Sequence, residues 1–283
     1  MRAAASVASY DMKPKPATLA LPALALALAA TATACTQSVG DGKAENRTFR
    51  IGTDATTLTI DADDTAVELV PVDREGGEIA VTRWFKAEKW NGDVGTKWSV
   101  EGDTLRFRTK CSGVIVSCDS RYRVEVPRDL DVRIDGSDGR IEATGFDTRL
   151  DITSGDGAVE VADAGGPLNI EARDGSVRID GAAGPVDVDA RDGSVRATDL
   201  TAARVTASLG DGSLHLGFTA TPDEVTAESR DGGLTLELPK APYRVSTDVR
   251  DGSTDVSVPR DPASPHRVDA TTADGSVTIR PAN

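Results

Sequence analysis

Apolar and polar residues alternate in short runs along most of the chain. From residue 130 onward most runs carry two apolar residues that lie two positions apart, as in Val177/Ile179 and Val186/Val188. A spacing of two places both side chains on the same face of a β-strand. No 3.6-residue periodicity is sustained beyond the N-terminal segment, so the pattern predicts an all-β protein with almost no helix.

The runs are separated by Asp-Gly pairs that recur with a nearly constant period. Their glycines follow one another in steps of 18, 18, 18, 19, 20, 20 and 23 residues between Gly139 and Gly275. Fixed periods near this size are typical of repeat architectures. We interpret six of these pairs as structural turns of the repeat: Asp156-Gly157, Asp174-Gly175, Asp192-Gly193, Asp211-Gly212, Asp231-Gly232 and Asp251-Gly252.

Two topologies agree with this pattern. An Asp-Gly between alternating runs is a strong hairpin signal, which would give an antiparallel meander or a propeller. Alternatively, each unit is one coil of a right-handed, single-stranded β-solenoid that turns at the Asp-Gly. The constant period favours the solenoid, because stacked coils need equal path lengths. We assign residues 129–283 to this solenoid and residues 49–128, which show strand-like alternation, to a small N-terminal β module.

Stacking has an electrostatic consequence for the repeat turns. Coils in register would align the turn aspartates, and carboxylates about 5 Å apart repel one another. Four arginines directly before an Asp-Gly could offset this repulsion: Arg173, Arg191, Arg230 and Arg250. A calcium ladder is the alternative, but its repeat carries a different glycine-rich consensus, so we predict neither a metal site nor a cofactor.

The N-terminus has the features of an export signal. Residues 17–34 are apolar and uncharged and follow Lys13 and Lys15. The residues 32–35, Ala-Thr-Ala-Cys, resemble the lipobox of bacterial lipoproteins, which implies cleavage of a signal peptide over 1–34 and lipidation of Cys35. An ordinary cleaved signal is the alternative, and Met12 is a second possible start. The polar residues 35–48 then form a flexible tether.

Two further cysteines, Cys111 and Cys118, lie in the N-terminal β module. Outside the cytoplasm such a pair favours a disulfide, and two thiols without a nearby histidine supply too few metal ligands. The same region holds all three tryptophans: Trp84, Trp90 and Trp98. An aromatic cluster could form a platform for glycans, but we favour a role in the core of the module.

Charge and motifs exclude several classes of function. The net charge of −14 argues against nucleic acid as a partner, because phosphate binding depends on Lys and Arg. The only histidines are His215 and His266, and neither a nucleophile elbow nor a P-loop accompanies them. We therefore predict no catalytic residues.

The features together resemble the bacterial putative-adhesin β-strand-repeat family, known as domain of unknown function 4097. The resemblance covers residues 49–280 and depends on repeats such as SGDGAVEV (154–161) and ARDGSVRI (172–179). It implies an all-β, solenoid-like fold on the outside of a cell envelope. We expect a non-catalytic, lipid-anchored protein that contacts the membrane through its anchor and has an envelope polymer or protein as partner.

A carbohydrate-active β-helix enzyme, such as a polysaccharide lyase or hydrolase, is the alternative function. Such enzymes usually interrupt their coils with long loops that build a cleft. Here the loops between repeats are short, and the longest departure spans residues 260–267. The pattern therefore favours binding or scaffolding.

Overall fold

The computed structural model describes residues 37–74 and 77–282. These residues belong to one compact unit, Cys35–Asn283, and contain sixteen strands and no helix. The predicted all-β class is confirmed for the described part of the chain. No described helix is long and apolar enough to cross a membrane. The predicted signal peptide and Cys35 lie outside the described residues.

The strands fall into two sets: six N-terminal strands and ten repeat strands. The N-terminal strands are β1 (Gln37–Val39), β2 (Ala44–Arg50), β3 (Thr57–Ala62), β4 (Ala66–Val72), β5 (Glu78–Glu101) and β6 (Thr104–Pro127). The repeat strands are β7 (Asp131–Gly136), β8 (Ile141–Thr144), β9 (Leu150–Ser154), β10 (Val159–Ala164), β11 (Leu168–Ala182), β12 (Val186–Leu200), β13 (Arg204–Phe218), β14 (Glu224–Leu238), β15 (Arg244–Val256) and β16 (Arg267–Pro281).

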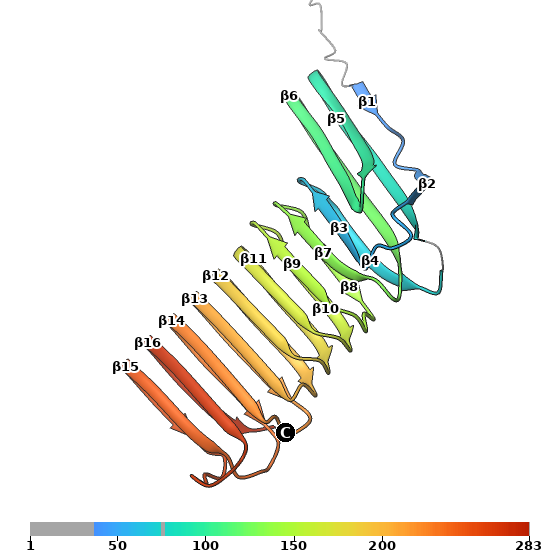
Figure 1. Cartoon of the computed structure of the whole chain (residues 1–283). Helices are drawn as coiled ribbons and strands as arrows, with labels where there is room; N and C mark the ends of the chain where they lie inside the picture. Colours follow the sequence, from blue (N-terminus) through green and yellow to red (C-terminus); the bar gives the residue numbers. More distant parts are fainter. Residues whose placement is uncertain (1–36, 75–76, 283) are drawn as a thin grey trace, which may run out of the picture. The chain divides into compact units, whose positions relative to one another are not determined.

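Successive repeats stack as parallel coils (Figure 1). Strands β11 and β12 pair in parallel with Gly175 opposite Gly193, and β12 and β13 continue with Gly193 opposite Gly212. Each long repeat strand contains one Asp-Gly, so both legs of a coil lie in a single strand. Parallel stacking is the arrangement predicted for solenoid coils, and the antiparallel alternative is wrong for these repeats.

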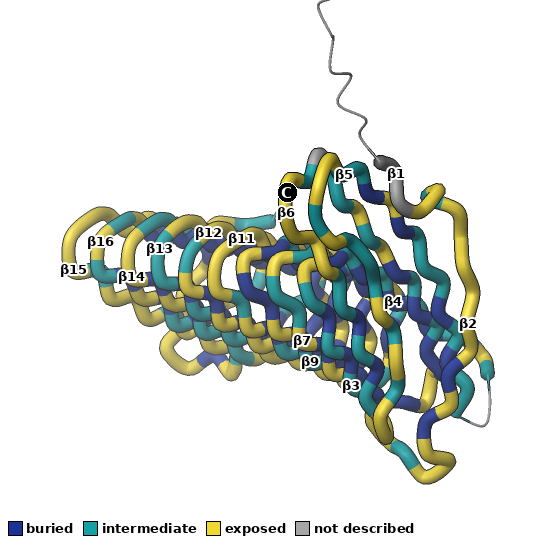
Figure 2. The backbone as a smooth tube through the Cα atoms, turned by 90° about the horizontal axis from the view of Figure 1, so that it is seen from above, coloured by how far each residue is buried: buried dark blue, intermediate teal, exposed yellow. Residues whose placement is uncertain are grey.

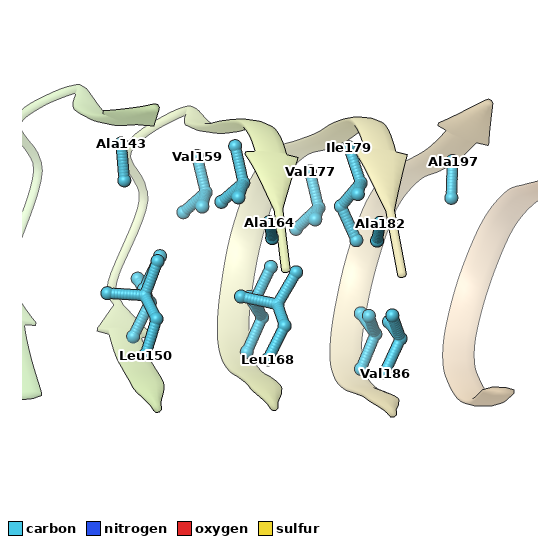
Figure 3. Close-up of a cluster of buried hydrophobic side chains, with 14 of the residues drawn as sticks. Ala143, Leu150, Val159, Ala164, Leu168, Val177, Ile179, Ala182, Val186 and Ala197 are labelled. Carbon is cyan, nitrogen blue, oxygen red and sulfur yellow. The ribbon is translucent and has the colours of Figure 1, made fainter. Parts of the chain in front are cut away.

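The core fills the inside of the coils (Figure 2). Most of the apolar pairs that the sequence spaces by two are buried, including Leu168/Ile170 and Val177/Ile179. Figure 3 shows that equivalent residues of successive coils, such as Leu150, Leu168 and Val186, lie in a row along the stack. Since every inward position contacts its counterpart on the neighbouring coil, small and medium-sized side chains suffice to fill the interior.

The parallel ladder continues into the N-terminal strands. Strand β3 pairs in parallel with β7, β4 pairs in parallel with β8, and β6 pairs with both β3 and β4. The exception is β5, which forms a long antiparallel hairpin with β6. The predicted division into residues 49–128 and 129–283 stays a prediction, although hydrogen bonding crosses it without a break.

Two short strands occupy residues for which the sequence predicts a flexible tether. Strand β1 pairs with β5 with Gln37 opposite Lys89, and β2 pairs with β5 with Phe49 opposite Ile79. Phe49 is buried, so this segment is held by an apolar contact as well as by backbone hydrogen bonds. Residues 37–39 and 44–48 therefore extend the sheet, since the otherwise free edge of β5 supplies their hydrogen-bond partners.

The last two strands are exchanged in the stack. The spatial order is β14-β16-β15, so the C-terminal strand lies between its two predecessors. The inward residues Val277 and Ile279 of β16 are fully buried, whereas β15 presents Thr254 opposite Val277. The more apolar strand thus occupies the position covered on both sides, and the more polar strand ends the stack.

Candidate binding groove along the repeat corner

The corner of each coil is formed by the predicted Asp-Gly turns. Gly175, Gly193 and Gly212 have φ angles of 135°, 123° and 132°, a region that favours glycine. The carbonyl oxygen of each glycine also lies against the next coil: a Cβ placed on Gly193 would lie 1.9 Å from the oxygen of Gly175. Both the backbone conformation and the close approach therefore require glycine. The Asp231-Gly232 and Asp251-Gly252 pairs lie at the same corner, and Asp156-Gly157 lies in the bend between β9 and β10.

The turn aspartates form a row along the stack. In register, Asp174, Asp192, Asp211, Asp231, Asp274 and Asp251 occupy equivalent positions on six neighbouring coils. Burial, and after it a hydrogen bond with Asp174, raises the pKa of Asp192. Burial and a hydrogen bond with Asp211 likewise raise the pKa of Asp231. The row therefore carries mutual repulsion between carboxylates, as the sequence predicts.

Only one of the four arginines before the turns offsets this repulsion through an ion pair within the described chain. Arg230 donates from Nη2 to Oδ2 of Asp211 at 3.0 Å, and this contact holds the pKa of Asp211 below its ordinary value. Among the described residues, Arg173, Arg191 and Arg250 form no ion pair. The predicted neutralising role is thus visible at one arginine, and three guanidinium groups remain free for a ligand.

Two adjoining hollows run along this corner and share Asp189 and Arg191. One has a volume of about 570 Å³ and extends towards Arg230 and Arg250. The other has a volume of about 540 Å³ and extends towards Arg173 and Gly155. We call the two together the corner groove, which is lined by carboxylates as well as arginines: Glu171, Asp189, Glu228 and Asp248.

The wall of the corner groove contains two buried hydroxyl groups. Ser229 and Thr272 are 6% and 2% exposed, and their oxygens have no hydrogen-bond partner among the described residues. A buried hydroxyl without a hydrogen-bond partner destabilises the folded state. A polar ligand or a water molecule could supply the missing hydrogen bond. The sequence indicated the arginine row by its period, but it gave no signal for these hydroxyls or for the hollows.

Other chemistry is sparse in the described ranges. No group of three or more His, Cys, Asp or Glu residues there is arranged to hold a metal ion. His215 lies on β13, where burial lowers its pKa, and His266 contacts the carbonyl oxygen of Pro222 through Nδ1 at 2.9 Å. The two histidines therefore lie in different local environments. The calcium ladder stays an untested alternative.

The N-terminal aromatics divide between core and surface. Phe107 and Tyr122 are fully buried and stack with their ring centroids 4.1 Å apart, and Trp98 packs beside Tyr122 at 6.2 Å. Arg121 lies over the ring of Trp84, whereas Trp90 is 59% exposed. Cys111 and Cys118 form a disulfide within β6. The favoured core role thus applies to the cluster around Tyr122 and not to Trp90.

Comparisons place this architecture among known proteins. The family model described as Toastrack DUF4097 matches residues 53–280. A "putative adhesin" from Parabacteroides merdae ATCC 43184 is similar in structure, with a TM-score of 0.53 and 14% identity over 86% of this chain and 98% of that chain. A second, from Bacteroides fragilis NCTC 9343, has a TM-score of 0.44 and 14% identity over 86% and 98% of the two chains. No curated protein matches the chain.

Proposed function

The chain belongs to the Toastrack DUF4097 family, and from this premise we propose that it is a lipid-anchored, non-catalytic protein of the cell envelope that binds an extracellular polymer or protein. The corner groove is its binding surface. The right-handed solenoid predicted from the repeats is part of the same proposal. Two observations support this assignment: a disulfide, which is typical of proteins outside the cytoplasm, and a groove with a repeating set of polar side chains.

The single observation that carries the binding role is the arginine row, in which only Arg230 is paired with a carboxylate among the described residues. Coils in a parallel stack repeat at about 4.8 Å, so groups at the corner recur with a fixed spacing. Arg173 and Arg191 lie on neighbouring coils, and Arg230 and Arg250 follow at intervals of two coils. A linear polymer with regularly spaced acidic or hydroxyl groups would match these arginines and the carboxylates between them. Guanidinium groups bind such oxygens through charge-assisted hydrogen bonds.

Lipidation of Cys35 supplies the membrane attachment in this proposal. The full-length Cys35→Ala variant should lose the lipid and appear in the soluble fraction, whereas the unmodified chain stays with the membranes. Mass spectrometry of the N-terminal peptide would detect the acyl chains. Equal membrane retention of both proteins would refute the anchor.

A binding experiment tests the groove. Immobilised polysaccharide fractions and proteins from cell envelopes should retain the unit 35–283, and an Arg173→Ala/Arg191→Ala variant should bind about tenfold more weakly or worse. Arg178→Ala is the matched control, because Arg178 lies on β11 but does not line the corner groove. Unchanged binding by the double variant would refute the groove. Shortening of a bound polysaccharide would refute the non-catalytic role.

A further inference from the structure

Two exposed hydrophobic residues occupy neighbouring positions on the paired strands β5 and β6. Trp90 is 59% exposed and Val114 is 51% exposed, and they are the exposed large hydrophobic residues among those whose burial the structure describes. Asn91 pairs with Val114, and Trp90 lies in the irregular step between Lys89 and Asn91. Single exposed apolar residues are common on surfaces, but a cluster marks a contact with another apolar phase.

The structure holds this cluster in a fixed position. We call residues 89–94 and 111–118 the hairpin tip, although they lie midway along the paired strands and the turn that joins β5 to β6 is at residues 102–103. Gly92 and Gly113 pair across it with φ angles of 120° and 101°, and a Cβ on Gly92 would lie 1.8 Å from the oxygen of Ser112. The Cys111–Cys118 disulfide closes the tip with a Cα–Cα distance of 6.5 Å. Trp90 and Val114 therefore lie on a constrained part of the paired strands β5 and β6, which lowers the entropy lost on docking.

The hairpin also carries an unusual share of the positive charge. Six lysines occur in the described residues, and four of them lie on β5 and β6: Lys86, Lys89, Lys97 and Lys110. Over residues 86–97 and 108–121, six Lys and Arg residues stand against three Asp and Glu residues. The whole chain, by contrast, carries −14. The hairpin is thus a cationic region on an acidic protein, which suits an anionic surface.

The course of the chain brings the expected lipid to the same place. Strand β1 pairs with β5 with Gln37 opposite Lys89, the residue before Trp90. Cys35 precedes Gln37 by two residues, which can span at most about 7 Å. Acyl chains on Cys35 would therefore enter the membrane beside the hairpin tip.

We propose that the hairpin tip docks on an anionic phospholipid bilayer. Trp90 and Val114 enter the interfacial region, where tryptophan is favoured, and the lysines of the hairpin lie against the phosphate groups. A single lipid anchor restricts position but leaves orientation free. A second contact at the tip fixes how the repeats stand relative to the membrane. The orientation depends on the proposed anchor, whereas the docking contact itself does not.

Vesicle binding by protein without a lipid tests the contact directly. The unit 35–283 contains all sixteen strands, and with Cys35→Ser it carries neither acyl chains nor the apolar segment 17–34. It should co-sediment with vesicles of phosphatidylcholine and phosphatidylglycerol at a 7:3 ratio, and the vesicles should shield Trp90 from acrylamide quenching. Trp90→Ala/Val114→Ser should weaken binding by about tenfold or more.

Matched charge variants complete the experiment. Lys89→Glu should weaken binding in low salt, whereas Lys240→Glu should not, because Lys240 is a described lysine outside the hairpin. Equal binding by the Trp90→Ala/Val114→Ser variant, equal effects of both lysine variants, or no shielding of Trp90 would overturn the proposal. So would a dimer in vesicle-free solution that Trp90→Ala dissociates, since the tip would then bind a second copy. Because Cys35 is replaced throughout, these outcomes are independent of the anchor and of the groove.

Discussion

Glycine at the coil corner satisfies two separate conditions. Its positive φ is unfavourable for side chains with a Cβ, and the carbonyl oxygen of the preceding coil occupies the space that a Cβ would need. At Gly193 the two conditions coincide, with φ at 123° and the Gly175 oxygen 1.9 Å from the Cβ position. The stacking distance at the corner is therefore set by backbone contact.

Gly193→Ala should destabilise the protein by about 3 kcal/mol or more, because the backbone must leave its φ region and the two coils must separate locally. Gly95→Ala is the control, since a Cβ at Gly95 meets nothing within 4 Å and Gly95 has no positive φ. Urea unfolding of both variants measures the difference. Similar midpoints for the two would contradict a corner set by backbone contact.

The aspartate row predicts opposite effects for two neighbouring carboxylates. The pKa of Asp192 is raised by burial and by Asp174, so its ionisation destabilises the fold as pH rises through that pKa. The pKa of Asp211 is lowered chiefly by Arg230, so its ionisation stabilises the fold, and this contribution is lost as pH falls through that pKa.

Asp192→Asn should accordingly raise the melting temperature at pH 7 and have little effect below pH 3.8, the ordinary aspartate pKa. Asp211→Asn should lower the melting temperature at pH 7, and its effect should diminish as the pH falls towards the lowered pKa of Asp211. Asparagine keeps the turn preference of aspartate, so each variant mainly removes the charge. Thermal unfolding of the two variants and the parent at pH 7 and pH 3 provides the comparison. Shifts of the same sign at pH 7 would contradict the uneven pairing.

At the scale of single strands, the exchange places β16 in the interior of the stack and β15 at its end. Ile279 and Val256 are register partners, but Ile279 is fully buried while Val256 is only partly covered. Ile279→Ala should cost about 3 kcal/mol, whereas Val256→Ala should cost about 1 kcal/mol. Denaturant unfolding of both variants gives the two values. Equal costs would mean that the end of the stack is covered in solution.

The alternation of residues such as Leu168/Ile170 and Val177/Ile179 was enough to predict strands, inward faces and the position of each turn. It could not predict the strand exchange, because β15 and β16 carry the same Asp-Gly signal. The two strands differ in residues such as Thr254, a polar residue at an inward position of β15. The importance of this difference becomes clear only when the neighbouring strands are known. The strand residues within 37–48 were missed for a similar reason: their partner β5 is remote in sequence and sets their conformation. The corner groove required three-dimensional register, which brings Arg173, Arg191 and the more distant Arg230 to one edge.

Across the described unit, binding and attachment are assigned to different parts. The corner groove belongs to the repeat strands β7–β16, whereas the two exposed large apolar residues and most described lysines lie on the β5–β6 hairpin. Parallel stacking allows this separation, because each coil contacts mainly its neighbours and can vary its outward side chains independently. The residues that line the groove can therefore change while the inward residues keep the stack intact.

The same nearest-neighbour organisation predicts how the unit opens. Strand β12 pairs with β11 and β13, whereas β15 pairs with β16 alone among the described strands. Opening β15 breaks one ladder and exposes few buried apolar side chains, while opening β12 breaks two ladders and uncovers core residues on both sides. In hydrogen exchange followed by mass spectrometry, peptides from β15 should therefore exchange about tenfold faster than those from β12, a difference of about 1.4 kcal/mol in opening free energy. Ile279→Ala should accelerate exchange in β15 and β16 and leave β12 unchanged, because the lost contact lies at that end of the stack. Uniform protection from β11 to β15 would instead mean that the stack opens only as a whole.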